Sequence, residues 1–205
     1  MTIQVENLGK RFNREWIFKN LTSRFEQGNT YAITGPNGSG KSTLLQVLWG
    51  QMPASSGKIS YQLKDKAVVI EDVFQHVSIA TPYMDLIEEY TLEEMIRFHF
   101  QFKKVRQSKS VTELMELMEL THARDKVISN FSSGMRQRVK LGLAFFSDTP
   151  MLFLDEPTTN LDKKSTEWYL KYLYQLPADS LIFIASNQEH EYPVSAKKID
   201  ILSFK

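Results

Sequence analysis

Two kinds of hydrophobic pattern divide this chain of 205 residues. The runs Met151–Leu154 and Leu181–Ala185 are apolar without interruption, which is typical of strands buried on both faces of a parallel sheet. The shorter run Tyr31–Ile33 has the same character. Between residues 84 and 146, by contrast, apolar residues recur mainly at helical spacing. The pattern therefore predicts an α/β fold in which a helical segment is inserted between strands of a parallel sheet.

The first 25 residues alternate short apolar stretches with charged ones, as at Ile3, Val5 and the residues that follow. This alternation predicts a small, mostly antiparallel sheet, with turns near Asn13 and Gly28. Phe12 belongs to the same stretch. Its ring suits either stacking on a nucleobase or packing within the sheet, and spacing alone favours neither.

Start signals for two helices stand out in the middle of the chain. Thr91 to Glu94 and Ser110 to Glu113 each have the spacing of a capping box, ahead of apolar residues at helical intervals. The basic stretch 103–109 between them is interpreted as a solvated connector. The loosely alternating tail 199–204 predicts a last strand.

Composition narrows the class of protein. The net charge of +1 gives no bulk electrostatic attraction to nucleic acid or to anionic membranes, so no nucleic-acid partner is expected. The absence of cysteine excludes disulfides and thiolate metal sites. No apolar window approaches the ~18 residues of a membrane span, and the first residues lack the pattern of a signal peptide. A cytoplasmic protein is expected.

A glycine-rich segment follows the run Tyr31–Ile33 and precedes an apolar helical pattern, and it fits G-x-x-x-x-G-K-[ST]. In this context the glycines let successive backbone N–H groups face one concavity, and the helix N-terminus adds its own N–H groups and dipole. Lys41 is expected to reach the β- and γ-phosphates of a nucleotide, and Ser42 to ligate Mg²⁺. The segment consists of Gly35, Pro36, Asn37, Gly38, Ser39, Gly40, Lys41, Ser42 and Thr43.

Two carboxylates follow the buried run Met151–Leu154 directly. In parallel sheets, ligands bind beyond the carboxyl ends of the strands, so Asp155 and Glu156 are expected beside the phosphate site. The natural division of labour assigns Asp155 to hydrated Mg²⁺ and Glu156 to the attacking water as general base. The run 181–185 ends beside the same site, at Ser186 and Asn187.

Ser132, Ser133 and Gly134 open a long apolar helix. Taken alone, they indicate only an N-capped helix. Their N–H groups would form an anion site if they faced a phosphate.

At this point the chain resembles the ATP-binding cassette (ABC) ATPases. The glycine-rich segment, the stretch 131–138, the strand end at residues 152–157 and the loop Thr159–Asp162 fall in that family's order and spacing. The resemblance covers essentially the whole chain, 1–205, as a single domain. It implies a P-loop NTPase core with an antiparallel β subdomain, formed by 1–83 and 147–205, and a helical subdomain inserted at 84–146.

The resemblance also implies roles and partners. ATP and Mg²⁺ would bind between the P-loop of one chain and Ser132–Gly134 of a second, in a head-to-tail homodimer or heterodimer. Phe12 would be the base-stacking aromatic, and Thr159–Asp162 the family's D-loop. The helical subdomain would face an integral membrane permease on a separate chain, so that the protein is peripheral on the cytoplasmic face of the membrane.

The chain departs from the family's pattern in three places, the last of which covers two residues. Pro82 stands where a glutamine is usual, which puts a Mg²⁺ contact and part of the coupling to a partner in doubt. Asn187 stands at the position of the switch histidine; its amide can still donate to a γ-phosphate oxygen, and His190 is a weaker replacement candidate. In the signature, Ser133 replaces a glycine and Met135 a glutamine, and the second change removes a polar contact.

The leading hypothesis is an ATP-hydrolysing subunit that powers a separate membrane transporter, with Lys41, Glu156 and Asn187 as the catalytic residues. The alternative is a regulatory or weakly hydrolysing subunit that binds ATP without efficient turnover, because of Pro82 and Asn187. A small P-loop kinase, or a translation or DNA-repair ATPase, fits the sequence less well. The docking groove for the permease is expected beside Pro82, Tyr83 and the acidic turn 85–89.

Overall fold

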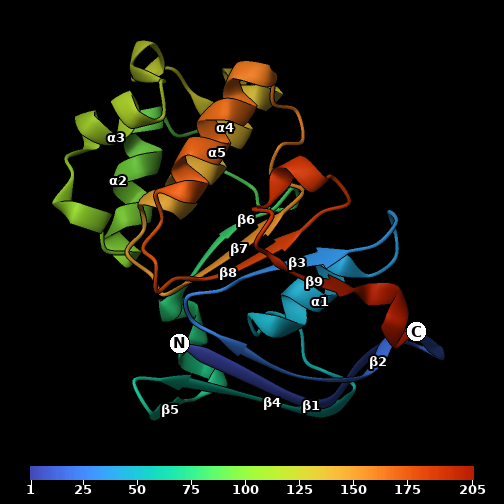
Figure 1. Ribbon diagram of the computed structural model, residues 1–205. Helices are drawn as coiled ribbons and strands as arrows, with labels where there is room; N and C mark the ends of the chain where they lie inside the picture. Colours follow the sequence, from blue (N-terminus) through green and yellow to red (C-terminus); the bar gives the residue numbers. More distant parts are fainter. The chain divides into compact units, whose positions relative to one another are not determined.

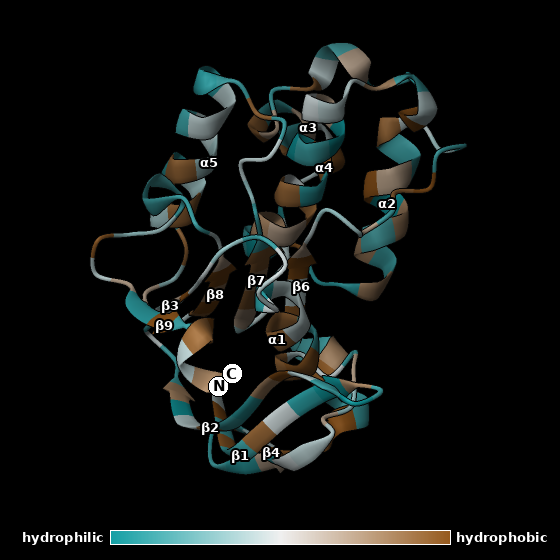
Figure 2. Ribbon diagram, turned by 90° about the vertical axis from the view of Figure 1, so that its right-hand side faces the viewer, coloured by the Kyte–Doolittle hydropathy of each residue, from teal (hydrophilic) through white to brown (hydrophobic).

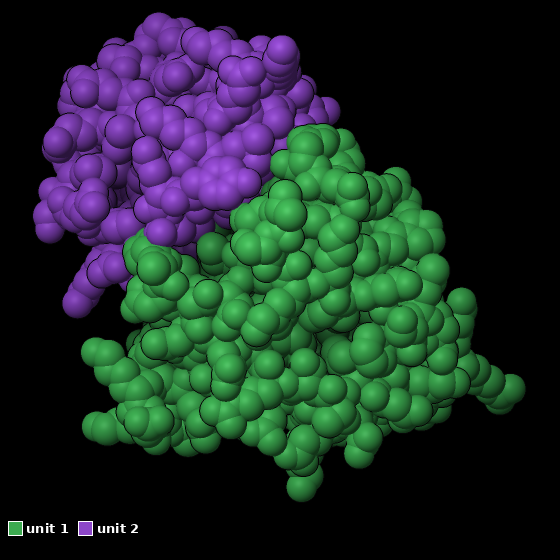
Figure 3. All heavy atoms as spheres, in the orientation of Figure 1, with its two compact units in different colours: residues 1–77, 150–156, 177–205 green, residues 78–149, 157–176 purple.

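The computed structural model describes residues 1–205 and divides into two compact units (Figure 3). Unit 1 consists of Met1–Val77, Pro150–Glu156 and Pro177–Lys205, and unit 2 of Ser78–Thr149 and Pro157–Leu176. The expected helical segment 84–146 lies within unit 2. No helix in the chain combines the length and the apolar character that crossing a bilayer requires.

An antiparallel sheet forms one layer of unit 1, in the order β2-β1-β4-β5 (Figure 1). Its first two strands form the hairpin that the sequence predicts, with the turn at Asn13 and Arg14. The side chains of Ile3, Val5 and Leu8 are fully buried, as the alternating pattern requires. The strands are β1 (Thr2–Phe12), β2 (Glu15–Glu26), β4 (Ser56–Leu63) and β5 (Lys66–Val68).

Parallel strands form the second layer of unit 1, in the order β7-β8-β3-β9. Every residue of β7 and β8 is buried, which confirms the prediction of central strands, and both are mostly hydrophobic in Figure 2. The rings of Phe153 and Phe183 stack across these two strands at 4.7 Å between centroids. The strands are β3 (Thr30–Thr34), β7 (Met151–Asp155), β8 (Leu181–Ala185) and β9 (Lys197–Asp200). Another strand, β6 (Val77–Ala80), begins at the boundary of the two units.

Helix α1 (Lys41–Leu48) lies between the two sheets of unit 1 (Figures 1 and 2). Its apolar side chains Leu44, Leu45 and Leu48 are fully buried, because the helix has a sheet on either side. This packing holds the N-terminus of α1 at the carboxyl end of β3, where the glycine-rich segment connects the two elements. The fold thus positions the predicted phosphate site.

Unit 2 is largely helical, and both predicted capping boxes are present. At the first, the hydroxyl of Thr91 accepts a hydrogen bond from the backbone N–H of Glu94, and the carboxylate of Glu94 accepts one from the backbone N–H of Thr91. Ser110 and Glu113 form the same pair of bonds. The helices are α2 (Leu92–Phe102), α3 (Val111–Leu117), α4 (Ser133–Phe146) and α5 (Lys163–Tyr174). Short turns of 3₁₀ helix in the two units span Ile70–His76, Arg106–Ser108, Thr121–Ala123, Ile128–Asn130, Glu189–Glu191 and Ile201–Phe204.

The predicted last strand is wrong in its position. Strand β9 ends at Asp200, and the chain then turns into the 3₁₀ helix Ile201–Phe204. The cause is a local cap: the carboxylate of Asp200 accepts a hydrogen bond from the backbone N–H of Leu202 at 3.0 Å, which starts the turn.

Candidate functional site

The segment Gly35–Thr43 forms an open turn that leads from β3 into α1, within unit 1. Three of its glycines have positive φ, at 141° for Gly35, 75° for Gly38 and 103° for Gly40. Gly40 is the N-cap of α1 and supplies no side chain to the first turn of the helix, which also holds no acidic residue. The N–H groups at this helix start therefore have no side-chain cap, and their role as an anion site stays a prediction.

Two of these glycines are required by their neighbours as well as by their φ. A side chain on Gly40 would collide with Ile17 of β2, and one on Gly35 would lie 2.7 Å from Cγ2 of Ile201. At Gly38, by contrast, a Cβ would meet no atom within 4 Å. The turn therefore packs closely against Ile17 and Ile201 and has open space at Gly38.

Lys41 is buried, with only 4% of its surface exposed. Its ammonium donates to the backbone carbonyls of Gly35 at 2.8 Å and Pro36 at 3.2 Å. An ammonium has three N–H donors, so these two bonds hold the charge at the turn and leave one donor for a phosphate oxygen. Burial strengthens such an interaction because water screens it less.

Asp155 ends β7 and is 2% exposed. Its Oδ1 atom is buried without a hydrogen-bond partner, and its carboxylate accepts from the hydroxyl of Ser42. Burial raises the pKa of the Asp155 carboxyl above its usual range, the Ser42 bond opposes the rise, and the charge of Glu156 adds to it. An orphaned carboxylate oxygen beside a hydroxyl is an oxygen donor set that fits Mg²⁺.

Glu156 follows at the strand end and is only partly buried. Its φ is 45°, a left-handed conformation that is uncommon for a residue with a side chain. A hydrogen bond from its backbone N–H to the carbonyl of Ala185, at 2.9 Å, holds it there. Strained conformations of this kind concentrate at functional sites, which suits the catalytic role expected for Glu156.

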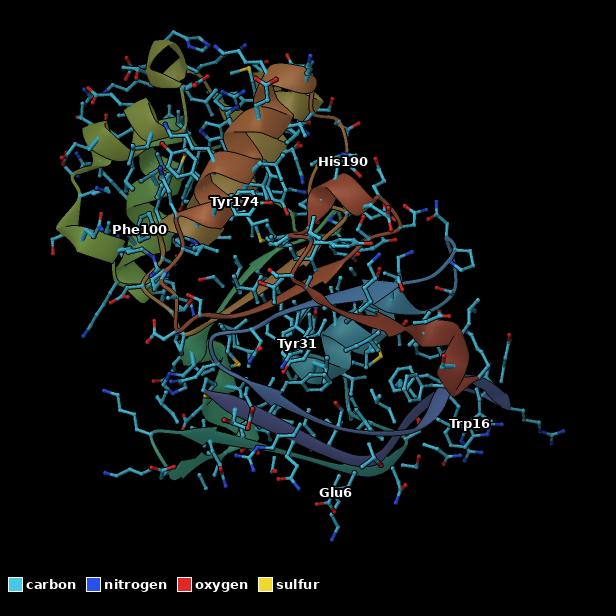
Figure 4. The ribbon with its side chains drawn as sticks, viewed as in Figure 1. Glu6, Trp16, Tyr31, Phe100, Tyr174 and His190 are labelled. Atoms are coloured by element: carbon cyan, nitrogen blue, oxygen red, sulfur yellow. The ribbon has the colours of Figure 1, made fainter.

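Asn187 lies at the end of the neighbouring strand, and its side-chain amide donates to Oδ1 of Asn37 at 3.3 Å. The residue before it, Ser186, is fully buried and donates its backbone N–H to Ile33 at the end of β3. The structure therefore brings Asn187 to the glycine-rich turn, as expected. His190 lies further on, in the 3₁₀ turn after β8 (Figure 4).

Phe12 ends β1 in the hairpin that also carries Ile17. Its ring is 46% exposed, and the ammonium of Lys10 lies 5.2 Å from the ring centroid. This exposure favours stacking on a ligand over packing within the sheet. Its role as a base-stacking residue stays a prediction.

Ser132, Ser133 and Gly134 lie in unit 2, at the start of α4. Ser132 caps the helix by accepting the backbone N–H of Met135 at 3.2 Å. These residues line a cavity of about 420 Å³ together with Asn160 and Asp162 of the predicted D-loop. The residues expected to meet a second chain, Ser132–Gly134, therefore share one surface of unit 2 with the predicted D-loop.

Pro82 also lies in unit 2, where the ammonium of Lys140 donates to its carbonyl at 3.1 Å. The same ammonium lies 3.4 Å from the carbonyl of Thr81. A cation from α4 is thus fixed beside the position where the resembled family has a glutamine. Sequence reasoning did not identify Lys140.

Sequence reasoning also missed two residues that act on the site from distant parts of the chain. The ammonium of Lys205 donates to the backbone carbonyl of Ser39 at 2.7 Å, although the two residues are 166 positions apart. Glu191 is fully buried, and its charge acts on Asp155. Nothing in the local sequence pattern signals either residue, because both act through contacts that only the fold creates.

Comparison with known proteins gives a consistent picture. A family profile described as ABC transporter matches residues 18–159. The chain is 33% identical over 207 residues to the sulfate/thiosulfate import ATP-binding protein CysA of Thermosynechococcus vestitus, covering 95% of this chain and 60% of that protein. It is 30% identical over 206 residues to the ribose import ATP-binding protein RbsA of Lactococcus lactis subsp. cremoris, covering 95% of this chain and 42% of that protein.

Solved structures agree on the fold. A putative ABC transporter ATP-binding protein from Pyrococcus furiosus superposes with a TM-score of 0.81 at 20% identity, covering 100% of this chain and 99% of the other. A dimeric bacterial ABC transporter cassette superposes with a TM-score of 0.76 at 21% identity, covering 91% and 88%. The P-loop NTPase architecture expected from the sequence is confirmed.

Proposed function

Because the chain belongs to the ABC transporter family, we propose that it hydrolyses ATP to power a transporter whose membrane-spanning part is a separate chain. The observation that carries the proposal is the group of Lys41, Ser42, Asp155 and Glu156 in one compact unit. The two relatives named above are ATP-binding proteins of import systems, and this favours import. The chain spans 60% and 42% of those two proteins.

Each part of the site has a role in phosphoryl transfer to water. The N–H groups of the turn and the ammonium of Lys41 bind the phosphates and offset their charge. Ser42 and Asp155 would hold Mg²⁺, which neutralises charge on the β- and γ-phosphate oxygens. Glu156 accepts the proton of the attacking water, a contribution of ~10²–10⁴-fold in rate, and the amide of Asn187 donates to a γ-phosphate oxygen.

A second copy, or a related subunit, would complete the site. The start of α4 has exposed Ser132 and Ser133 and no acidic residue in its first turn, so it can receive an anion. Its neighbours Asn160 and Asp162 line the same cavity. ATP bound at one P-loop would bring this surface of the other chain onto the triphosphate.

A cavity of about 430 Å³ in unit 2 suits the membrane partner. The predicted acidic turn lines it through Asp85, Glu88 and Glu89, opposite Arg136 and Lys140. Such a mixed-charge groove would accept a polar segment of the permease, and the protein would then be held at the cytoplasmic face of the membrane. The alternative of a subunit with little turnover finds no support among the relatives.

Release of phosphate from ATP tests the proposal. Purified protein should hydrolyse Mg·ATP, and Glu156→Gln should lower kcat at least ~10²-fold while the affinity for ATP is unchanged. Glu6→Gln is the matched control, because Glu6 is exposed on β1 and is not a residue of the site. Equal turnover by Glu156→Gln and wild type would overturn the role of Glu156.

A further inference from the structure

A cavity of about 410 Å³ in unit 2 takes no part in the site described above. It lies where the loop after α2 meets the C-terminal ends of α4 and α5. This volume is in the range of pockets that bind small molecules. We call it the α4–α5 cavity.

Its charge is one-sided. Arg106, Lys109 and Lys171 line it, and no aspartate or glutamate does, although the whole chain carries a net charge of only +1. Three acids act from outside: Asp148 lies 4.0 Å from Arg106, the charge of Lys109 acts on Glu113, and the charge of Glu119 acts on Tyr172. Three cations around one concavity make a local positive potential that attracts anions.

The floor of the cavity is aromatic. Phe145, Phe146 and Tyr172 line it, and all three are buried. The rings of Phe146 and Tyr172 meet edge to face at 5.1 Å between centroids, so the floor is rigid. The ammonium of Lys171 lies 5.3 Å from the centroid of Tyr172.

The basic wall is fixed by the backbone. The guanidinium of Arg106 donates to the carbonyls of Phe145 at 3.3 Å and Ser147 at 2.9 Å. The backbone N–H of Asp148 donates to Lys104 at 2.8 Å, which ties the loop to the end of α4. A site assembled in advance loses less entropy when a ligand binds.

The same loop has an uncommon conformation. Gln107, which lines the cavity, and Ser108 have φ of 59° and 52°. Two successive left-handed residues with side chains are strained, and such strain clusters at ligand sites.

We propose that the α4–α5 cavity binds a small organic anion that carries a phosphate group on an apolar body. The phosphate would lie among Arg106, Lys109 and Lys171, and the apolar body on Phe146 and Tyr172. This chemistry occurs in soluble phosphorylated compounds and in lipid headgroups. The site is separate from the P-loop, which lies in unit 1.

Calorimetric titration with phenyl phosphate tests the proposal on the full chain. Wild type should bind it saturably, whereas benzyl alcohol, which has a ring but no charge, should not bind. The variant Lys109→Gln/Lys171→Gln should bind at least about tenfold more weakly, because it loses two charge-assisted contacts. The control Lys58→Gln/Lys66→Gln removes two exposed lysines of unit 1 and should bind as wild type does.

Three results would overturn the proposal: no saturable binding of phenyl phosphate, equal binding by Lys109→Gln/Lys171→Gln, or equal binding of benzyl alcohol. Loss of binding in Lys41→Ala with full binding by Lys109→Gln/Lys171→Gln would place the probe at the P-loop and also overturn it. Phosphatidylcholine vesicles with and without phosphatidic acid distinguish a lipid headgroup from a soluble phosphorylated compound as the ligand. Lysine-dependent binding to vesicles with phosphatidic acid supports a lipid headgroup, and lysine-dependent binding of phenyl phosphate alone supports a soluble compound.

Discussion

The side-chain amide of Asn187 donates a hydrogen bond to the side-chain oxygen of Asn37, at 3.3 Å. The two residues are 150 positions apart in sequence, yet the bond ties the end of β8 to the glycine-rich turn. An asparagine amide donates a hydrogen bond but does not titrate near neutral pH, unlike the histidine of the resembled family. ATP hydrolysis that depends on Asn187 would therefore not depend on the protonation of this residue.

Substitutions at Asn187 test that role. Asn187→Asp removes the donor and adds a negative charge beside the triphosphate, so the affinity for Mg·ATP should fall by about tenfold or more. Asn187→His should still hydrolyse ATP, with a new pH dependence near the ordinary histidine pKa of about 6.5. Binding titrations and rates of phosphate release measure both, with the exposed Asn20→Asp as control. Wild-type affinity in Asn187→Asp would exclude contact with the nucleotide.

Replacing Asp155 should separate stability from Mg²⁺ binding. Burial raises the pKa of its carboxyl in the folded state, so the folded chain binds more protons than the unfolded one and stability falls as pH rises through that interval. Asp155→Asn keeps the acceptor for Ser42 and removes the charge. Without nucleotide, the variant should therefore melt higher than wild type at pH 8, by about 2–4 °C for each kcal/mol gained.

The same variant should lose the strengthening of ATP binding by Mg²⁺, because the amide oxygen is a weaker ligand for a hard cation. Calorimetric melts and ATP titrations with and without Mg²⁺ give both quantities. A lower melting temperature for Asp155→Asn, or unchanged dependence on Mg²⁺, would contradict the role given to Asp155.

Glu88 and Arg136 form an ion pair at 2.8 Å in the groove proposed to bind the permease, and charge changes there test that proposal. Both side chains are substantially exposed, so the pair contributes little to stability. Glu88→Lys/Glu89→Lys should reduce co-purification of the membrane subunit about tenfold and leave ATP binding unchanged. Glu88→Arg/Arg136→Glu restores the pair with its charges exchanged.

The exchanged pair should melt slightly below wild type, because the hydrogen bond from Arg136 to the carbonyl of Ser129 at 2.8 Å is lost. It should still co-purify poorly, because the partner meets the opposite charges. Glu6→Lys, on the exposed part of β1, is the control for added positive charge. Full co-purification by both groove variants would move the docking surface elsewhere, and loss of ATP binding would mean that the acidic turn belongs to the nucleotide site.

His99 predicts a pH dependence of stability. The hydroxyl of Ser147 donates to the carbonyl of Leu143 at 2.7 Å, so His99 donates its Nε2–H to that hydroxyl, at 3.0 Å. Burial, aided by the charge of Lys103, lowers the pKa of His99 to about 4. The unfolded chain takes up this proton near pH 6.5 and the folded chain only near pH 4, so stability is lost as pH falls between these values.

The loss should be of order 2 kcal/mol over that interval, since each unit of pKa difference corresponds to about 1.4 kcal/mol and the side chain is not fully buried. His99→Gln can still donate to Ser147 and does not titrate. Its urea-unfolding free energy should therefore change less with pH than that of wild type. Parallel pH profiles for the two proteins would contradict the proton uptake assigned to His99.

Local signals in the sequence predicted much of the fold. The capping boxes at Thr91 and Ser110 and the buried runs of β7 and β8 depend on neighbouring residues alone, and the structure has all four. The prediction of the last strand is wrong in position because a single capping side chain, Asp200, outweighs the alternating pattern.

The support of the candidate site could not be predicted in this way. Ile17 and Ile201 are apolar residues like many others until the fold sets them against Gly40 and Gly35. Lys205 lies 166 positions from the carbonyl to which it donates. Motif spacing therefore identifies the residues that would contact the nucleotide, and only the fold identifies the residues that hold them in place.

Titration of the protein with Mg·ATP tests most directly whether the turn around Lys41 is the triphosphate site. We predict saturable binding by wild type and an affinity at least ~10²-fold weaker for Lys41→Ala, since a buried ammonium contributes more than an exposed one. Lys58→Ala, an exposed lysine of unit 1, should bind as wild type does, and melting curves establish that all three proteins are folded. Equal affinity of folded Lys41→Ala and wild type would contradict the assignment of this turn as the triphosphate site.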